Sequence, residues 1–361
     1  NLGMDNPNGS QRYYIGHVDW TGFNGLVEYT GSDQFSAVVQ FGTSSQTYQW
    51  EGFYTAAPST KSRKITVDGG YIKGGANYRM NENSNIFFNV GQIMRPPSFD
   101  GVFPNADYDF EEADDITNES FTSFELGYGF ISSNFKANIN AYHTVWGDRT
   151  LRRSTSIDDQ GVRIIYDGVE QTHQGIEAEM TWYPSSRLRI RGMASIGDWK
   201  YSKNFDGDAY FIDNNQPAGT TGTLYLDGVK IGDAAQSVLY LGADYKLSSK
   251  LSMDLDIMSF GNLHGRFGPL DSEFNSANNR GSIKLPSWGT VDLGATYRFS
   301  LLGYDTTARL NINNLLDEEY LSQSQTNFHN DGGRTWNGVN VENQVYFGKG
   351  TTWNLGLNIR F

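Results

Sequence analysis

Alternation of apolar and polar residues, repeated in many short segments, constrains this chain more than any other feature. In 290–299 the apolar side chains fall at odd positions, and polar residues or glycine fall at even positions. The stretch 353–361 repeats this pattern, and 124–130 and 176–182 behave in the same way. Because successive side chains of a β-strand point to opposite faces, a period of two predicts strands with one apolar and one polar face. The chain is expected to be all-β.

The predicted strands are separated by connections that alternate between two lengths. The short connections have three or four residues, and most of the long ones have about twenty or more. In an antiparallel sheet this order places all tight turns at one end and all long loops at the other, which is typical of outer-membrane β-barrels. The thirteen predicted strands are approximately 20–30, 34–53, 64–80, 85–94, 119–130, 135–150, 173–183, 187–200, 236–247, 251–266, 288–299, 304–325 and 345–361.

Two other architectures share part of this pattern. A secreted antiparallel sandwich or a propeller also alternates, with its apolar face on a protein core instead of lipid. The many charges and glycines of the polar face, and the absence of a repeat of about 40 to 50 residues, favour the transmembrane barrel. A transmembrane helix is excluded, because the longest apolar runs have only four residues, as at Val238–Leu241.

Composition excludes several classes of function. The net charge of −13 argues against a nucleic-acid partner, whose phosphates require a basic surface. The absence of cysteine excludes disulfide frameworks, thiolate metal sites and cysteine nucleophiles. The first residues carry neither the charged nor the apolar region of a signal peptide, so the chain is expected to begin either as a mature protein or within a longer one.

Charged residues on the polar face allow two predictions of register. The hairpin formed by 173–183 and 187–200 is expected to place Glu179 opposite Arg191. The hairpin that follows is expected to place Asp244 opposite Asp254, which is unfavourable unless a cation or water lies nearby. A wet lumen, or a lumen filled by another domain, is therefore predicted.

Several segments resemble TonB-dependent outer-membrane receptors. NINNLLDEEYL at 311–321 resembles the family's N-L-F-D-x-x-Y signature, with leucine where phenylalanine is commoner, and GQIMRPPSFDGVFP at 91–104 resembles its R-A-P-S segment. The hairpin THQGIEAEMTWYPSSRLRIRGMAS at 172–195 is similar to the family's G-x-E-x-E hairpin. The terminal Phe361 resembles the barrel assembly signal, and NAYHTVWGDR at 140–149 is closest to Bacteroidota members.

The resemblance implies an antiparallel transmembrane β-barrel of 22 strands in the outer membrane of a Gram-negative bacterium. It also implies an N-terminal plug domain and a TonB box, neither of which is visible in this chain. Residues 1–361 are therefore expected to be part of one β-barrel domain, comprising the carboxy-terminal 13 of 22 strands, because an odd number does not close a bacterial single-chain barrel.

The implied function is active transport. A scarce, bulky small-molecule ligand, such as a ferric siderophore or a similar metal chelate, would be imported with energy from TonB, which would bind the N-terminal region absent here. The alternatives are a SusC-like importer of glycans that pairs with a surface lipoprotein, and a structural or secretion-associated barrel in an envelope complex. Lipid of the outer membrane would surround the barrel in each case.

Neither catalysis nor a cofactor is expected. Five scattered histidines lack the spacing of a catalytic triad or a metal cluster, and the acidic run 107–115 lacks the spacing and central glycine of an EF-hand. Ligand contacts are expected where aromatic and guanidinium groups meet at the junctions of strands and loops, because arginine suits anionic chelates or carboxylates and aromatic faces suit sugars or catechols. The candidate ligand-binding residues are Arg95, Trp146, Arg149, Arg152, Trp199, Tyr210, His264, Arg266 and Trp336.

Overall fold

One large antiparallel sheet dominates the protein. The computed structural model describes residues 14–53, 60–103, 112–113, 116–157, 160–211, 216–219, 222–268 and 271–360. Thirteen strands follow one another across the sheet in chain order, each hydrogen-bonded to the next. They are β1 (Tyr14–Tyr29), β2 (Phe35–Gly52), β4 (Ile65–Asn81), β5 (Ser84–Arg95), β6 (Glu119–Ile131), β7 (Phe135–Ile157), β8 (Gln160–Ser185), β9 (Leu188–Tyr201), β12 (Ser237–Lys246), β13 (Leu251–Gly261), β14 (Trp288–Leu301), β15 (Tyr304–Asn313) and β20 (Thr352–Arg360).

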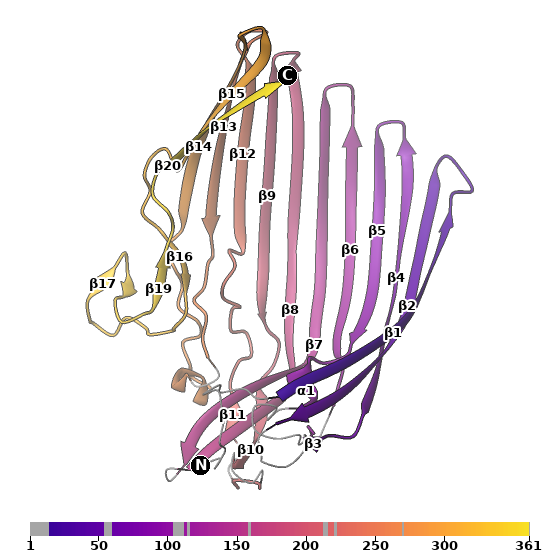
Figure 1. Cartoon of the computed structure of the whole chain (residues 1–361), viewed down its shortest axis with the longest axis vertical. Coiled ribbons are helices and arrows are strands. Elements are labelled where there is room, and N and C mark those ends of the chain that lie inside the picture. The colour runs from indigo at the N-terminus through magenta and orange to yellow at the C-terminus, as the bar shows by residue number, and fades with distance from the viewer. Residues whose placement is uncertain are drawn as a thin grey trace.

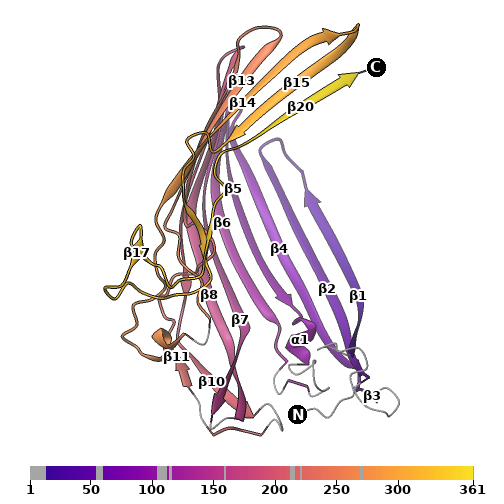
Figure 2. The same cartoon turned by 60° about the vertical axis from the view of Figure 1, so that its left-hand side comes forward.

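The thirteen predicted strands are therefore confirmed, together with the sorting of their connections. All six tight turns lie at one end of the sheet, here called the turn end, and the long connections lie at the other, the loop end (Figure 1). The sheet is strongly curved, with β1 and β20 at the two ends of the strand path (Figures 1 and 2). Within the described ranges, no helix has the length and apolar character that crossing a bilayer requires.

Several predicted boundaries are wrong, mostly at the loop end. The stretch 151–172, expected to be a loop, mostly continues β7 and β8 beyond the neighbouring strands. The strands expected at 251–266, 304–325 and 345–361 are shorter or interrupted, because hydrogen bonds between loops replace the regular ladder there. The smaller elements are β3 (Thr60–Lys61), α1 (Phe99–Val102), β10 (Phe205–Phe211), β11 (Gly222–Leu224), the 3₁₀ helix η1 (Ser272–Asn275), β16 (Leu321–Ser324), β17 (Thr335–Trp336), β18 (Val339–Asn340) and β19 (Val345–Phe347).

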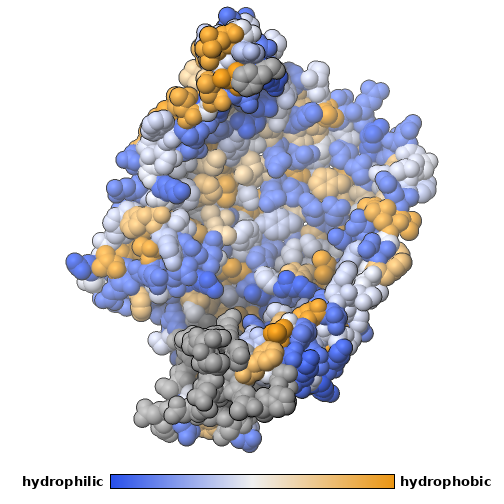
Figure 3. Space-filling view, viewed as in Figure 1, coloured by the Kyte–Doolittle hydropathy of each residue, from blue (hydrophilic) through white to orange (hydrophobic). Residues whose placement is uncertain are grey.

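The two faces of the sheet differ as the alternation predicts. Leu355 and Leu357 are 66% and 58% exposed, and similar side chains extend along neighbouring strands, so a continuous apolar surface is open. Such a surface is expected to face lipid in an outer-membrane barrel. The opposite, concave face is rich in hydrophilic residues (Figure 3). The apolar face is therefore not part of a dry protein core.

Glycines on the concave face let side chains meet across an intervening strand. Arg191 and Asp256 lie on either side of Gly242, directly opposite it in register, and Arg191 Nη2 donates to Asp256 Oδ1 at 3.0 Å. Arg309 on β15 similarly reaches Asp254 on β13 past Gly294. Contacts that skip a strand require converging side chains, which the concave side of a curved sheet supplies.

These arginines also resolve the unfavourable carboxylate pair. Asp244 lies opposite Asp254, as predicted. Arg189 Nε and Arg191 Nε lie 2.9 and 3.2 Å from Asp244 Oδ2, and Arg309 Nη2 donates to Asp254 at 2.7 Å. Arginine side chains of the chain itself therefore provide the positive charge that the predicted Asp244–Asp254 pair needs nearby.

The predicted pairing of Glu179 with Arg191 is wrong. Glu179 lies opposite Met193, and Arg191 lies opposite Thr181. The register shifts between Trp182 and Ser185, where the ladder is irregular. A shift of two residues keeps each side chain on its face but changes its partner.

Substitution of Gly294 by valine is expected to lower the free energy of unfolding by about 2 kcal/mol, because it separates a partly buried ion pair. A Cβ atom there would lie 2.2 Å from both Arg309 Nη2 and Asp254 Oδ2. Gly356→Val is the matched control, since a Cβ atom at Gly356 meets only a backbone oxygen at 4.0 Å. Urea unfolding monitored by tryptophan fluorescence would measure both variants, and equal losses would contradict the role of Gly294.

Candidate functional site

A cavity of about 420 Å³ lies at the loop end of the sheet. Its wall comes from β7, β8 and β9, and its other side comes from β11 and the connections that follow β11 and β13. The connections approach closely, since a Cβ atom at Gly232 would lie 2.5 Å from the backbone oxygen of Gly265. The residues of this mouth cavity are Trp146, Arg149, Leu151, Gln171, His173, Tyr201, Leu224, Ile231, Gly232, Asp233, Arg266 and Phe267.

A cationic and aromatic cluster forms one wall of the mouth cavity. The Arg149 guanidinium lies over the Trp146 ring, 3.7 Å from its centroid. Trp146 stacks on Phe121 with ring centroids 5.0 Å apart, and its Nε1 donates to Glu119 Oε2 at 3.2 Å. Arg95 forms an ion pair with the same Glu119 carboxylate. This carboxylate therefore fixes Trp146, which in turn supports Arg149.

The Arg149 side chain retains hydrogen-bonding capacity. Its Nε is buried and has no hydrogen-bond partner among the described residues, and no carboxylate of the described residues forms a salt bridge with it. A guanidinium group offers five N–H donors in one plane and remains charged. Arg149 is thus the group of the cavity best suited to bind an anionic oxygen.

The opposite wall combines a second cation with aromatic rings. Arg266 is well exposed, and its Nε lies 3.8 Å from Asp233 Oδ2, which is a loose contact. Phe267 lies 5.7 Å from Tyr201 and 4.2 Å from Phe274, measured between ring centroids. Beneath these rings is a hydrophobic core formed by Tyr166, Val169, Phe205, Leu224, Leu226, Val229 and Phe274. A packed core therefore adjoins the cavity and supports this wall.

The structure groups only some of the predicted contact residues. Trp146, Arg149 and Arg266 line the mouth cavity, and Arg95 adjoins it through Glu119. Trp199 does not line the cavity but contacts one of its residues, since its ring centroid lies 5.6 Å from that of His173, and its Nε1 donates to the Tyr142 hydroxyl.

The other predicted residues lie elsewhere. Tyr210 lies on β10 opposite Arg163, and Trp336 packs against the core of another loop pair. His264 is 8% exposed beside Ser282, and burial lowers the pKa of its imidazole. The side chain of Arg152 lies outside the described part of the chain, as does most of the acidic run 107–115.

Nine of the twelve cavity residues were not predicted, and those with aromatic or ionisable side chains are His173, Tyr201, Asp233 and Phe267. Tyr201 ends β9 two residues after Trp199, so the aromatic enrichment at this junction was a usable signal. Asp233 and Phe267 belong to irregular connections, where periodicity carries no information.

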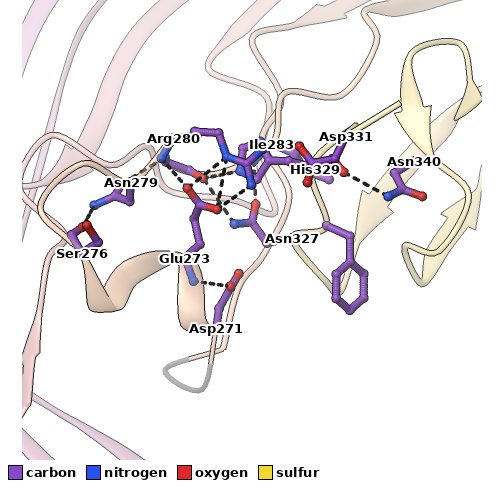
Figure 4. Close-up of polar contacts among 12 residues, drawn as sticks. Asp271, Glu273, Ser276, Asn279, Arg280, Ile283, Asn327, His329, Asp331 and Asn340 are labelled. Carbon is purple, nitrogen blue, oxygen red and sulfur yellow. Dashed lines mark hydrogen bonds and ion pairs between the residues drawn. The ribbon is translucent and has the colours of Figure 1, made fainter. Parts of the chain in front are cut away.

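A polar cluster joins two external connections beside this region (Figure 4). Arg280 pairs with Glu273 at 2.8 Å within one connection and with Asp331 at 2.6 Å in the next. His329 Nε2 lies 3.0 Å from the backbone oxygen of Gly281. Hydrogen bonding from Arg280 lowers the pKa of the Glu273 carboxyl, and the two carboxylates raise that of Arg280. The Arg280–Asp331 ion pair, the His329 contact and the hydrogen bond from the Ile283 N–H to Asn327 Oδ1 thus hold the two connections together.

Acidification is expected to loosen this loop contact. The pKa of the Glu273 carboxyl is lower in the folded protein than its usual value in an unfolded chain. The Glu273–Arg280 ion pair therefore contributes its full stabilisation above the usual pKa, and this stabilisation is lost as the pH falls through the folded pKa. The protection factors of the amides in 326–344, taken relative to the intrinsic exchange rate at each pH, should therefore fall below about pH 4. Arg280→Gln should show lowered protection of these amides already at pH 7, whereas unchanged protection in this variant would contradict a role of the Arg280 ion pairs in joining the two connections.

Comparison with known proteins agrees with this architecture. The family described as TonB dependent receptor-like, beta-barrel, matches residues 3–315. No curated protein matches the sequence of the chain.

Solved structures of the same fold include the siderophore receptor PiuA from Acinetobacter baumannii (14% identity, TM-score 0.68, 96% of this chain and 44% of that one). They also include the ferric yersiniabactin uptake receptor FyuA from Yersinia pestis (13%, 0.63, 96% and 47%) and the copper transporter OprC (13%, 0.61, 97% and 48%). The chain thus spans less than half the length of these structures. It belongs to the TonB-dependent receptor family of β-barrels, which span the outer membrane of Gram-negative bacteria.

Proposed function

We propose that this chain is the barrel part of a receptor that imports an anionic metal chelate, such as a ferric siderophore, across the outer membrane. In this proposal residues 1–361 are the carboxy-terminal 13 strands, and a plug domain and TonB box belong to an N-terminal region of the same protein. The energy for transport comes from TonB. The barrel contributes the ligand contacts and no catalysis.

The mouth cavity is the observation that carries this proposal. Two guanidinium groups, Arg149 and Arg266, line a cavity that also contains the rings of Trp146, Tyr201 and Phe267. Ferric chelates of catecholates or carboxylates combine negative charge with flat organic groups, so they suit both kinds of side chain. Two structures of similar fold are described as a siderophore receptor and a ferric yersiniabactin uptake receptor, which supports this choice of cargo.

An uptake assay tests the proposal. The whole receptor, with its N-terminal region, would be expressed in a Gram-negative strain lacking its own ferric siderophore receptors and grown under iron limitation. We expect uptake of ⁵⁵Fe supplied as a ferric catecholate or ferric citrate, and its loss in a strain without TonB. No TonB-dependent uptake of any ferric chelate would contradict the proposal.

The same assay separates the two alternatives. An importer of glycans would take up labelled oligosaccharides instead and would require a surface lipoprotein. A structural or secretion-associated barrel would take up neither compound and would co-purify with a stable protein partner.

A further inference from the structure

Asp233 has the only carboxylate among the twelve residues that line the mouth cavity in the described part of the chain. It shares the cavity with two guanidinium groups, those of Arg149 and Arg266. The hydroxyl of Tyr201 lies within electrostatic range of all three charges. A negative charge is thus placed in a cavity whose proposed cargo is itself anionic, and like charges repel. This carboxylate therefore requires an explanation.

The backbone at Asp233 explains a small polar residue but not its charge. Its φ angle is 71°, in the left-handed region that glycine, asparagine and aspartate adopt most readily. Its N–H donates to the His264 oxygen at 3.3 Å, and its Oδ1 accepts from Gln323 Nε2 at 2.7 Å. Asparagine would adopt this backbone and accept the same hydrogen bond with its own Oδ1. Neither the conformation nor these hydrogen bonds thus require a negative charge.

The charge of Asp233 acts instead on Arg266. Arg266 Nε lies 3.8 Å from Asp233 Oδ2, which is longer than a hydrogen bond. Other contacts hold both residues in place, because the Arg266 N–H donates to the Ser324 oxygen at 2.8 Å and Gln323 binds the Asp233 carboxylate. Both side chains are partly exposed, so an anion that enters the cavity can reach Arg266. Asp233 therefore attracts this arginine without locking it.

Arg149 is held in a different way. Its guanidinium lies on the Trp146 ring and forms no salt bridge with a described carboxylate. The first anionic group of a cargo therefore meets a cation that is not neutralised, whereas a second group must displace Asp233 from Arg266. After this displacement the Asp233 carboxylate remains in the cavity and repels the bound anion. The two arginines thus contribute unequally to the affinity for an anion.

We propose that Asp233 competes with an anionic cargo for Arg266 and thereby keeps the affinity of the mouth cavity low enough for the cargo to leave toward the lumen of the barrel. A transport site must bind its cargo well enough to capture it but weakly enough to release it. Two guanidinium groups without a competing carboxylate would hold a multiply charged anion more tightly. The inference rests on the proposed import of an anionic chelate and adds the residue that limits the affinity of its site.

Removal of the charge tests this competition. Asp233→Asn keeps the oxygen that accepts from Gln323, and the whole receptor in detergent would be titrated with a trianionic ferric tris-catecholate. We expect the Kd to fall about tenfold, because Arg266 becomes available and the repulsion is lost. In an Arg266→Gln background the same substitution should lower the Kd less than about threefold, since the competition requires this arginine.

Uptake by cells separates release from binding. Cells with the Asp233→Asn receptor should import the same chelate, labelled with ⁵⁵Fe, with a lower KM and with a Vmax reduced about threefold or more, because a tighter complex dissociates more slowly. Asp208→Asn removes an exposed carboxylate of β10, also at the loop end but outside the cavity, and is the matched control. It should change neither the Kd nor the uptake.

The outcomes distinguish this inference from the proposed import. An unchanged Kd in Asp233→Asn, an equal gain with and without Arg266, or an equal gain in Asp208→Asn would overturn the competition. A lower Kd with an unchanged Vmax would overturn the role in release. Binding of the chelate without any TonB-dependent uptake would contradict the import, while the comparison of Kd values would still decide on the competition. No binding by any variant would contradict both.

Discussion

Replacement of Asn314 by leucine is expected to lower the free energy of unfolding by about 3–5 kcal/mol, because it removes three buried hydrogen bonds and forces a branched side chain into left-handed backbone geometry. Asn314 is 4% exposed and has a φ angle of 50°. Its Nδ2 donates to the backbone oxygens of Glu318 and Lys349 at 2.9 and 3.1 Å, and its Oδ1 accepts from the Glu318 backbone N–H at 2.9 Å. The side chain therefore joins the end of β15 to the beginning of β20.

The neighbouring Asn313 provides a matched control. Asn313 is exposed, and its Nδ2 makes one hydrogen bond of 3.3 Å to Thr352 Oγ1. Asn313→Leu should therefore cost less than about 1 kcal/mol. Urea unfolding of the whole receptor in detergent, followed by heat-modifiable migration on gels, would compare the two variants. Similar losses for both would show that Asn314 has no special role.

Asn314 also shows what a sequence motif can and cannot reveal. The NNLLDEEY stretch indicated a family, but it did not indicate why those residues are needed. In the structure Asp317 Oδ1 accepts from the Thr351 N–H at 2.8 Å, and the Tyr320 ring stacks on Trp288 with centroids 3.8 Å apart. Leu316, where phenylalanine is commoner, is 71% exposed. The contacts of these residues thus involve partners far away in the chain, which no local pattern specifies.

The periodic part of the fold was predictable because its signal is local. Alternation defines each strand, and consecutive order defines the sheet, so the thirteen strands and the facing of Asp244 and Asp254 followed from the sequence. The exact register was harder to predict, because the irregular β8–β9 ladder between Trp182 and Ser185 places Arg191 opposite Thr181 instead of Glu179. The role of Gly294 was not predictable either. This glycine leaves room for the Arg309–Asp254 ion pair, whose side chains belong to the strands on both sides of it.

Only those residues of the candidate site that lie on strands could be predicted from the sequence. Trp146 and Arg149 lie on β7, and the sequence indicated them as aromatic and basic residues near the end of the predicted strand 135–150. Asp233 and Phe267 reach the same cavity from two irregular connections. Loop closure depends on contacts between connections, such as the hydrogen bond from the Asp233 N–H to the His264 oxygen at 3.3 Å. Periodicity contains no information on such contacts.

Replacement of Arg149 by glutamine is expected to raise the Kd for an anionic ferric chelate about 100-fold, which corresponds to about 3 kcal/mol. The guanidinium is held over the Trp146 ring, and its charge is not paired with a described carboxylate. Its interaction with an anion therefore requires neither the breaking of an existing ion pair nor a large rearrangement. Glutamine retains hydrogen-bonding groups but removes the charge, so the loss reports the electrostatic part of recognition.

Two further variants define what Arg149 contributes. Arg149→Lys keeps the charge but loses the planar group that lies on Trp146, so it should recover only part of the affinity. Arg79→Gln removes one cation from the opposite end of the barrel and should leave the Kd unchanged. Isothermal titration of the whole receptor with ferric citrate and with a ferric tris-catecholate would compare all three. Equal affinity of the Arg149→Gln variant and the unmodified receptor for both chelates would place their binding outside the mouth cavity, because no neutral side chain can replace the attraction of a guanidinium for an anion in a partly desolvated site.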